Sequence, residues 1–178
     1  MKNSNNINRK IIKVLREINI IEGQKILDCC CGEGNYTLPA AEIVGKNGLV
    51  YALDMNEEKL NALKKKSDLE NIENIKIIEK RFESNIPLPD RSVDVVLLYD
   101  VFWYFSLDDK RLPDLLDEVH RILKDESIVS VFPEHVDVGR LKEKIKKASF
   151  RLENEYYRKI IHENDYIKGH ILNYRKIG

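Results

Sequence analysis

The segment 26–55 constrains the fold of this chain more strongly than any other part of the sequence. Its hydrophobic pattern predicts, in order, a buried strand, a glycine turn, a helix and a second buried strand that ends on an acid. This order is typical of a nucleoside-cofactor site at the edge of a parallel sheet. The parts fall at 25–31 for the first strand, Gly32 and Gly34 for the turn, 35 or 36 to 44 for the helix, 49–53 for the second strand and Asp54 for the acid.

Each part of this unit has a physical task in binding a nucleoside. Glycines at the carboxyl end of a strand let the backbone approach a ligand that a Cβ atom would hold off. The N-terminus of the following helix offers main-chain N–H groups that have no partner inside the helix. An acid at the end of the next strand, here Asp54, is placed to accept hydrogen bonds from both hydroxyls of a ribose.

The spacing of the glycines separates two classes of cofactor that use this plan. Dinucleotide enzymes have a third glycine, which lets the helix pack close under a pyrophosphate, but the corresponding position here is Thr37. Asp28 and Glu33 would repel a diphosphate and suit a ligand with a positive centre. S-adenosylmethionine (SAM) has a sulfonium and an ammonium group and no phosphate, so the loop favours SAM over a nicotinamide dinucleotide.

The loop 28–34, Asp-Cys-Cys-Cys-Gly-Glu-Gly, resembles the D-x-G-C-G-T-G loop of class I SAM-dependent methyltransferases. Cys30 stands where that family commonly has glycine, and Glu33 stands where it commonly has threonine. Segment 86–98 is similar to the family's L-P-F-P-D-x-S-F-D-x-V pattern, and 114–124 is similar to its L-x-E-x-x-R-V-L-K helix. The resemblance therefore covers nearly the whole chain; it is specific for the cofactor and unspecific for the substrate.

This resemblance implies an α/β fold: a doubly wound, mostly parallel sheet of seven strands, with helices on both faces and an antiparallel last strand. The length of 178 residues suits one domain over 1–178. Residues 1–6 are polar and expected to be disordered. Apolar spacing predicts an amphipathic helix at about 7–19, and the last two strands are expected at 150–155 and 169–175, joined by a long connection.

The resemblance also implies roles for single residues. Asp54 would bind the ribose, and Asp28 would contact the methionyl end, directly or through water. The adenine contact stays open because the family often has Asp-Ala or Asp-Met where this chain has Lys-Arg-Phe-Glu at 80–83; Phe82 could stack on adenine, and Glu83 or a backbone group could accept from its amino group. The expected cofactor-binding set is Asp28, Cys30, Gly32, Glu33, Gly34, Asp54, Met55, Phe82, Glu83 and Asp100.

Two residues are candidates for a catalytic role. Asp100 follows the fourth predicted strand and could orient the substrate or cap the next helix. His135 follows the fifth strand, and its imidazole could act as a base near neutral pH, with an exposed loop histidine as the alternative. Methyl transfer often needs no base, because holding a nucleophile in line with an activated methyl group is most of the work.

Composition limits the compartment and the metal chemistry. The three cysteines are consecutive, at 29–31, so on a strand they alternate faces and cannot join distant segments. This indicates a reducing compartment, the cytoplasm. The cysteines are interpreted as small buried side chains, with a reactive thiol beside the loop as the alternative. The spacing of metal ligands at zinc sites is not found, so no metal is expected. No apolar run approaches the ~20 residues of a membrane span, and no signal peptide precedes the first helix.

The charge is balanced, with 30 Lys and Arg against 30 Asp and Glu, so no general affinity for nucleic acid or membranes is expected. Its distribution is uneven: residues 1–25 carry 6 basic and 2 acidic side chains, and residues 140–178 carry 11 and 5. We expect a solvated surface there. The alternative is that a helix at about 137–148, with Arg140 nearest the acceptor pocket, attracts an anionic substrate.

The sequence therefore predicts a SAM-dependent methyltransferase that acts on a small molecule. Residues 99–102 read Tyr-Asp-Val-Phe and lack the Asn-Pro-Pro-Tyr pattern of amino-nitrogen methylation, which argues against a nucleic-acid base as acceptor. The alternative from another class is a SAM-binding accessory or regulatory module without catalysis. A nicotinamide dehydrogenase is a third reading, opposed by Thr37 and Glu33. The sequence carries no signal for the oligomeric state or the acceptor atom.

Overall fold

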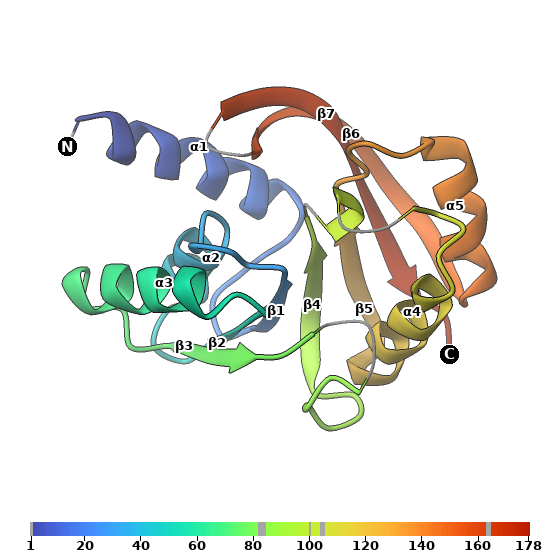
Figure 1. Cartoon of the computed structure of the whole chain (residues 1–178), viewed down its shortest axis with the longest axis horizontal. Helices are drawn as coiled ribbons and strands as arrows, with labels where there is room; N and C mark the ends of the chain where they lie inside the picture. Colours follow the sequence, from blue (N-terminus) through green and yellow to red (C-terminus); the bar gives the residue numbers. More distant parts are fainter. Residues whose placement is uncertain (1, 82–84, 100, 104–105, 163–164) are drawn as a thin grey trace.

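The core of the structure is one mixed sheet with the strand order β3-β2-β1-β4-β5-β7-β6 (Figure 1). The computed structural model describes residues 2–81, 85–99, 101–103, 106–162 and 165–178. Strands β1 to β5 are parallel to their neighbours, and β7 runs antiparallel to both β5 and β6. The predicted fold, a doubly wound and mostly parallel sheet whose last strand is antiparallel, is confirmed.

A helix joins the strands of each parallel pair that is consecutive in the chain, β1–β2, β2–β3 and β4–β5, as parallel pairing requires. The strands are β1 (Lys25–Cys29), β2 (Leu49–Asp54), β3 (Ile75–Glu79), β4 (Val93–Leu98), β5 (Leu123–Val131), β6 (Phe150–His162) and β7 (Asp165–Lys176). The helices are α1 (Lys2–Glu17), α2 (Thr37–Val44), α3 (Glu57–Leu69), α4 (Arg111–Ile122) and α5 (Val138–Lys147), with a short 3₁₀ helix η1 (Val101–Trp103) after β4.

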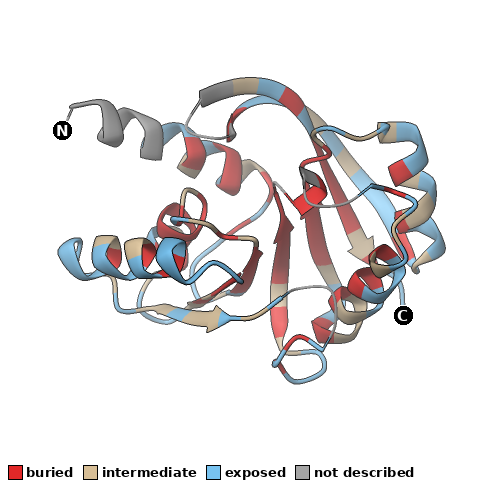
Figure 2. Ribbon diagram, in the orientation of Figure 1, coloured by how far each residue is buried: buried red, intermediate tan, exposed pale blue. Residues whose placement is uncertain are grey.

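Helices cover both faces of the sheet, because successive side chains of each strand point to opposite faces. Ile26 of β1 packs in the cluster that also holds apolar residues of α1 and α2. Its neighbour Leu27 packs on the opposite face, with residues of α4 and α5. Helix α3 lies beside α2, where Leu63 and Leu38 meet. The central strands β1 and β4 are accordingly buried almost along their whole length, as is the second half of β5 (Figure 2).

Two element boundaries differ from the sequence prediction at the N-terminal side. Helix α1 begins at Lys2, so it includes residues 2–6, which the sequence analysis expects to be disordered. No glycine or proline occurs before Gly23, and nothing in the local sequence stops the helical hydrogen bonds. Strand β1 ends at Cys29, two residues before its predicted end, because Cys30 has a φ of 58° and therefore leaves the extended conformation.

The prediction of a long connection between the last two strands is wrong. Strands β6 and β7 pair along almost their whole length, from Phe150↔Lys176 to His162↔Asp165. The outer half of this ribbon is stabilised by Ile160 and Ile161, which are buried against the cluster that contains α1. A two-stranded ribbon gains stability from such packing, and this apolar partner on α1 is not visible in local sequence.

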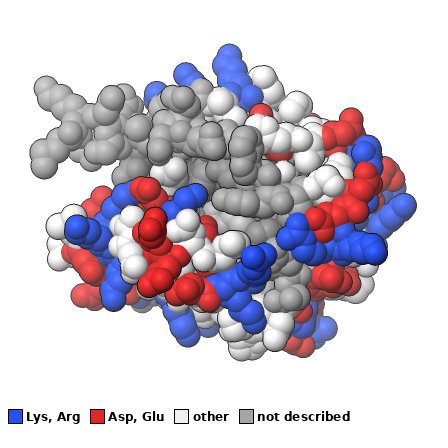
Figure 3. All heavy atoms as spheres, in the orientation of Figure 1, with Lys and Arg blue, Asp and Glu red and all other residues white. Residues whose placement is uncertain are grey.

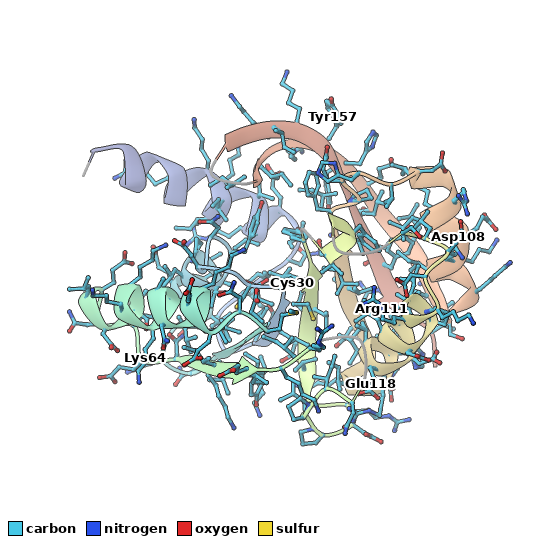
Figure 4. All side chains as sticks on the ribbon, in the orientation of Figure 1. Cys30, Lys64, Asp108, Arg111, Glu118 and Tyr157 are labelled. Carbon is cyan, nitrogen blue, oxygen red and sulfur yellow. The ribbon has the colours of Figure 1, made fainter. Side chains whose placement is uncertain are left out.

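The connection from β3 to β4 is held against α4 by one arginine. Arg121 donates to the carbonyls of Ile86 and Leu88, both at 2.9 Å, and forms salt bridges with Asp90 and Glu118. Glu118 in turn accepts from the N–H of Ile86 at 2.6 Å, and the hydrogen bonds from Arg121 lower the pKa of its carboxyl. Figure 4 labels Glu118 on α4, next to this connection. The contacts fix the proline-containing turn that leads into β4.

Candidate cofactor site

The loop after β1 has an unusual backbone conformation at three positions. Cys30, Gly32 and Gly34 all have positive φ angles, of 58°, 54° and 89°. Residues with a Cβ atom rarely adopt this region, so the alternating pattern explains why glycine suits each of these positions. Figure 4 shows Cys30 near the middle of the molecule, beside β1 and β4. The two glycines were identified from the sequence, but the strain at Cys30 was not.

The two glycines differ in what surrounds them. A Cβ atom added to Gly34 would lie 2.3 Å from Cδ1 of Leu63, a fully buried residue of α3. Among the described residues, the atom nearest to a Cβ added at Gly32 is Cδ of Lys59, at 3.9 Å, an ordinary van der Waals distance. Gly34 is therefore required by the packing of α3 against the loop, whereas no described residue crowds Gly32, whose backbone is partly exposed.

Asp54 ends β2 directly beside Gly32. Its Oδ2 accepts from the N–H of Gly32 and its Oδ1 accepts from the N–H of Asn56, both at 2.9 Å. The side chain of Asp54 is 6% exposed. The N-cap of α3 is Asn56, whose Oδ1 accepts from the N–H of Lys59. Asp54 therefore does not cap the helix; it ties the end of β2 to the glycine loop, and each oxygen keeps a lone pair for a ligand hydroxyl.

Asp28, the first acid of the loop, is buried and oriented by the following helix. The Oγ1 of Thr37 donates to its Oδ2 at 2.6 Å, and both residues are buried. Thr37 occupies the position of the third glycine in dinucleotide-binding loops. In those loops the glycine allows close packing of the helix, whereas here the threonine hydroxyl donates a hydrogen bond to Asp28. In the sequence, Thr37 argues only against a dinucleotide; its positioning contact with Asp28 becomes visible in the structure.

The remaining loop acid, Glu33, points toward α3. Its Oε2 forms a 2.9 Å salt bridge with Nζ of Lys66, which also donates to the Glu33 carbonyl. The hydrogen bond from Lys66 lowers the pKa of this carboxyl. Both side chains are about half exposed, so the pair contributes little to stability. Met55, expected in the same site, is 52% exposed at the end of β2.

The loop is also connected to the C-terminal ribbon through Tyr36. Its hydroxyl donates to the carbonyl of Ile161 at 2.6 Å and accepts from the N–H of the same residue at 3.1 Å. The ring of Tyr36 stacks edge-on against Tyr99 at the end of β4, with centroids 4.8 Å apart. Residues 36 and 161 are far apart in the sequence, and no local pattern indicates this contact. The outer end of β6 therefore lies against the cofactor loop.

The three cysteines behave as buried side chains. Burial is the main cause that raises the pKa of each thiol well above its ordinary range, and the neighbouring acids Asp28 and Asp54 add to the effect. A protonated thiol is a poor nucleophile and a poor metal ligand. Of the two interpretations drawn from the sequence, the structure favours small buried side chains over a reactive thiol.

The other predicted site residues either lie outside the described part of the chain or are exposed at the surface. Phe82, Glu83 and Asp100 lie outside the described residues. His135 is exposed in the segment after β5, with a φ of 66°. Arg140, at the start of α5, forms a 2.6 Å salt bridge with Asp108, which compensates the charge that would attract an anionic substrate in the alternative interpretation. In the described part of the chain, no group of three or more His, Cys, Asp or Glu residues could hold a metal ion, and no helix is long and apolar enough to cross a bilayer.

Comparison with known proteins identifies the family. A family model described as a methyltransferase domain matches residues 20–174. The chain belongs to this methyltransferase domain family. The demethylmenaquinone methyltransferase of Geobacillus stearothermophilus is 36% identical to it over 114 residues, which are 62% of this chain and 45% of that relative. The corresponding enzyme of Lactobacillus johnsonii is 30% identical over 122 residues, or 67% of this chain and 47% of the relative. The methyltransferase domain thus matches less than half the length of these relatives.

Solved structures share the fold of this methyltransferase domain at low sequence identity. A SAM-dependent methyltransferase from Aquifex aeolicus superposes with a TM-score of 0.76 at 22% identity, covering 93% of this chain and 88% of that chain. The cyclase SpnF superposes with a TM-score of 0.74 at 14% identity, covering 95% and 81%. Because one of these proteins is named as a cyclase, the fold alone does not determine the reaction.

The left-handed conformation of Cys30 leads to a prediction. Replacing it with glycine removes a backbone cost of about 1–2 kcal/mol, which offsets the greater flexibility of glycine in the unfolded chain. We expect Cys30→Gly to keep or raise the free energy of unfolding, by up to about 1 kcal/mol. Cys30→Val, with a β-branched side chain at the same φ, should lower it by about 2 kcal/mol. Urea denaturation measures both; equal losses in the two variants would contradict the backbone explanation.

Proposed function

We propose that this methyltransferase domain binds SAM in the loop between β1 and α2 and transfers its methyl group to a small-molecule acceptor. The observation that carries the proposal is the contact between Asp54 and Gly32, which places a buried carboxylate beside an open glycine backbone at the carboxyl edge of the sheet. Ligands of doubly wound sheets bind at this edge, next to the point where the strand order reverses. Here that point lies between β1 and β4.

The residues present fit this cofactor. Asp54 would hold the ribose hydroxyls, Gly32 would let the ligand approach the backbone, and Asp28 would face the methionyl end while Thr37 fixes its orientation. Two buried acids beside the loop, Asp28 and Asp54, suit a ligand with positive charge rather than a diphosphate, whereas the charge of Glu33 is paired with Lys66. When bound, SAM supplies a methyl group activated by the positive charge of its sulfur.

The acceptor is proposed from the named substrate of the relatives. Demethylmenaquinone is a naphthoquinone with a long isoprenoid chain, and its reduced ring is a carbon nucleophile. We propose an aromatic acceptor of this class, entering over the carboxyl ends of β4 and β5. His135, exposed just past the end of β5, is the proposed base that removes a proton from the ring hydroxyl. Asp100 remains a second candidate, for orienting the acceptor.

The first test of this function is ligand binding, followed by turnover. Calorimetry should show one site for SAM and for its demethylated product, and no binding of NAD. SAM with a labelled methyl group should then label a short-chain demethylmenaquinol, as followed by mass spectrometry, and His135→Gln should lower kcat by about a hundredfold while leaving SAM affinity unchanged.

The outcomes separate the alternatives. Tight NAD binding without any response to SAM would exclude the proposed cofactor. SAM binding without transfer to quinols or other aromatic acceptors would favour the accessory-module alternative, in which the domain binds the cofactor and does no chemistry. A His135→Gln variant with unchanged kcat would leave methyl transfer in place and remove the proposed base.

A further inference from the structure

The outward face of α1 carries basic side chains. Arg9, Lys13 and Arg16 follow one another at intervals of four and three residues, so they lie on one side of the helix. All three are exposed, whereas Ile11, Val14, Leu15 and Ile18 on the opposite side are buried in the core. The apolar stripe of this amphipathic helix is therefore fully used for packing. Its basic side remains at the surface.

The outer end of the β6–β7 ribbon adds further positive charge next to α1. Arg158 of β6 forms a 2.7 Å salt bridge with Glu17, and Tyr156 donates to the Glu17 carbonyl at 3.3 Å, so the ribbon and the end of α1 are in contact. Arg158 lies on the side of the ribbon that contacts the end of α1, so we group it with Arg9, Lys13 and Arg16 as one surface, the basic face. The exposed Lys159 and Lys168 are paired across the two strands and point to the other side of the ribbon. Figure 3 shows Lys and Arg side chains along the upper edge of the molecule, where Figure 1 places this ribbon.

Most of the charge on α1 is not compensated within the protein. Arg9, Lys13 and Arg16 form no salt bridge with any described residue, and Glu17 is already paired with Arg158. Helix α5 is compensated only in part: Arg140 is paired with Asp108 and Lys142 with Glu155, whereas Lys144, Lys146 and Lys147 form no salt bridge with a described residue. Helix α1 differs from α5 in its position, because its end contacts the ribbon that is bonded to the cofactor loop.

The basic face borders the candidate site. The hydroxyl of Tyr36, in the cofactor loop, is bonded to the main chain of Ile161 in the ribbon. At the next strand, Gly169 lies so close to Phe132, the residue after β5, that a Cβ atom there would be 2.4 Å from its ring. The outer end of the ribbon therefore lies at the carboxyl edge of the sheet. A partner on the basic face would sit next to the opening through which an acceptor enters.

We propose that the basic face is a docking surface for an anionic lipid bilayer. The choice of a bilayer rests on the proposed function, since a quinone with an isoprenoid chain is dissolved in lipid and must be reached at the membrane surface. Tyr157, on the same part of the ribbon, is 57% exposed and labelled at the top of Figure 4. Tyrosine is enriched at the level of the lipid headgroups, which agrees with this orientation. The balanced net charge of the whole chain does not reveal such a surface.

The size of the effect follows from the charges. A Lys or Arg near an anionic membrane strengthens binding about fivefold, so removal of three should weaken it on the order of a hundredfold. The attraction acts over about 10 Å at 0.1 M salt and about 3 Å at 1 M, so high salt should release the protein. The apolar stripe of α1 is buried in the core. The proposed binding is therefore electrostatic and does not involve insertion of this stripe into the bilayer.

The test is sedimentation of the full chain with sucrose-loaded vesicles. Vesicles of phosphatidylcholine with about one third phosphatidylglycerol should bind the protein at ~0.1 M salt, and vesicles of phosphatidylcholine alone should not. The triple variant Arg9→Gln, Lys13→Gln, Arg16→Gln should bind the anionic vesicles on the order of a hundredfold more weakly. Glutamine preserves the helix propensity of these exposed positions, and circular dichroism checks that the fold is kept.

A matched variant with the same change in charge provides the control. Lys46→Gln, Lys64→Gln, Lys65→Gln removes three exposed lysines from the turn before β2 and from α3 and should bind vesicles like the original protein. Equal losses in both triple variants, or no vesicle binding by the original protein, would overturn the proposal. Binding to a single-stranded RNA in place of vesicles would overturn it as well. Calorimetry with SAM, expected to be unchanged in the α1 variant, separates failure of the docking surface from failure of the proposed function.

Discussion

Replacing Gly34 with alanine is expected to lower the free energy of unfolding by about 2–5 kcal/mol. A φ of 89° costs a residue with a Cβ atom about 1–2 kcal/mol, and overpacking of a buried contact typically costs about 1–3 kcal/mol more. The contact in question is Cδ1 of Leu63, 2.3 Å from the added Cβ, and Leu63 is fully buried. Thermal unfolding should occur about 5–15 °C lower, measured by calorimetry.

Two further variants separate the causes of this effect. Gly23 has a φ of 83° and no atom within 4 Å of an added Cβ, so Gly23→Ala measures the backbone cost alone, about 1–2 kcal/mol. Gly34→Ala made in a Leu63→Ala background should also cost only that amount, because the obstructing side chain is gone. If Gly34→Ala costs the same with and without Leu63, the packing of α3 against the loop is not what requires glycine.

The second large effect is expected for Asp54→Asn, in the affinity for SAM. Charge-assisted hydrogen bonds contribute about 1.5–3 kcal/mol, so the loss of the carboxylate should weaken SAM binding tenfold to a hundredfold. A carboxamide also cannot accept from both Gly32 and Asn56, so one of the two N–H groups that Asp54 now binds would lose its acceptor. The affinity is measured by calorimetric titration, with the fold checked by circular dichroism.

Glu57→Gln is the matched control for this prediction. Glu57 lies in the first turn of α3, is exposed, and loses the same charge on substitution. Its SAM affinity should stay within about twofold of the original, since exposed charges interact weakly. An Asp54→Asn variant with unchanged affinity would assign Asp54 the role of holding the loop and nothing more. Equal losses in the two variants would indicate a general effect of charge.

The sheet and its order could be predicted because the information is local. The apolar runs at β1, β2 and β4 and the glycines between β1 and α2 are typical of parallel strands. Asp54 was singled out because it ends the second predicted strand, and Asp28 because it opens a loop that resembles the family's glycine loop. The structure places both beside the glycine loop.

The features that sequence reasoning missed depend on distant contacts. The hydroxyl of Tyr36 meets the main chain of Ile161, and Lys66 on α3 engages Glu33, whose carboxylate had been expected to face the cofactor. The length of the β6–β7 ribbon likewise depends on packing against α1. Each of these contacts joins parts of the chain whose proximity exists only after the sheet has formed, so no local pattern could indicate it.

The position of β7 in the sheet has a consequence for biosynthesis. It follows all the other strands in the chain order, yet it lies between β5 and β6, pairing with both. A ribosome adds about 5–20 residues per second, and until Asp165–Lys176 has emerged the edge of β5 has no partner and β6 has none at all. An open, apolar strand edge is a template for pairing with another chain. Nascent chains of this protein therefore stay vulnerable to aggregation until their last strand is complete, and chaperones that shield strand edges would act on them in that interval.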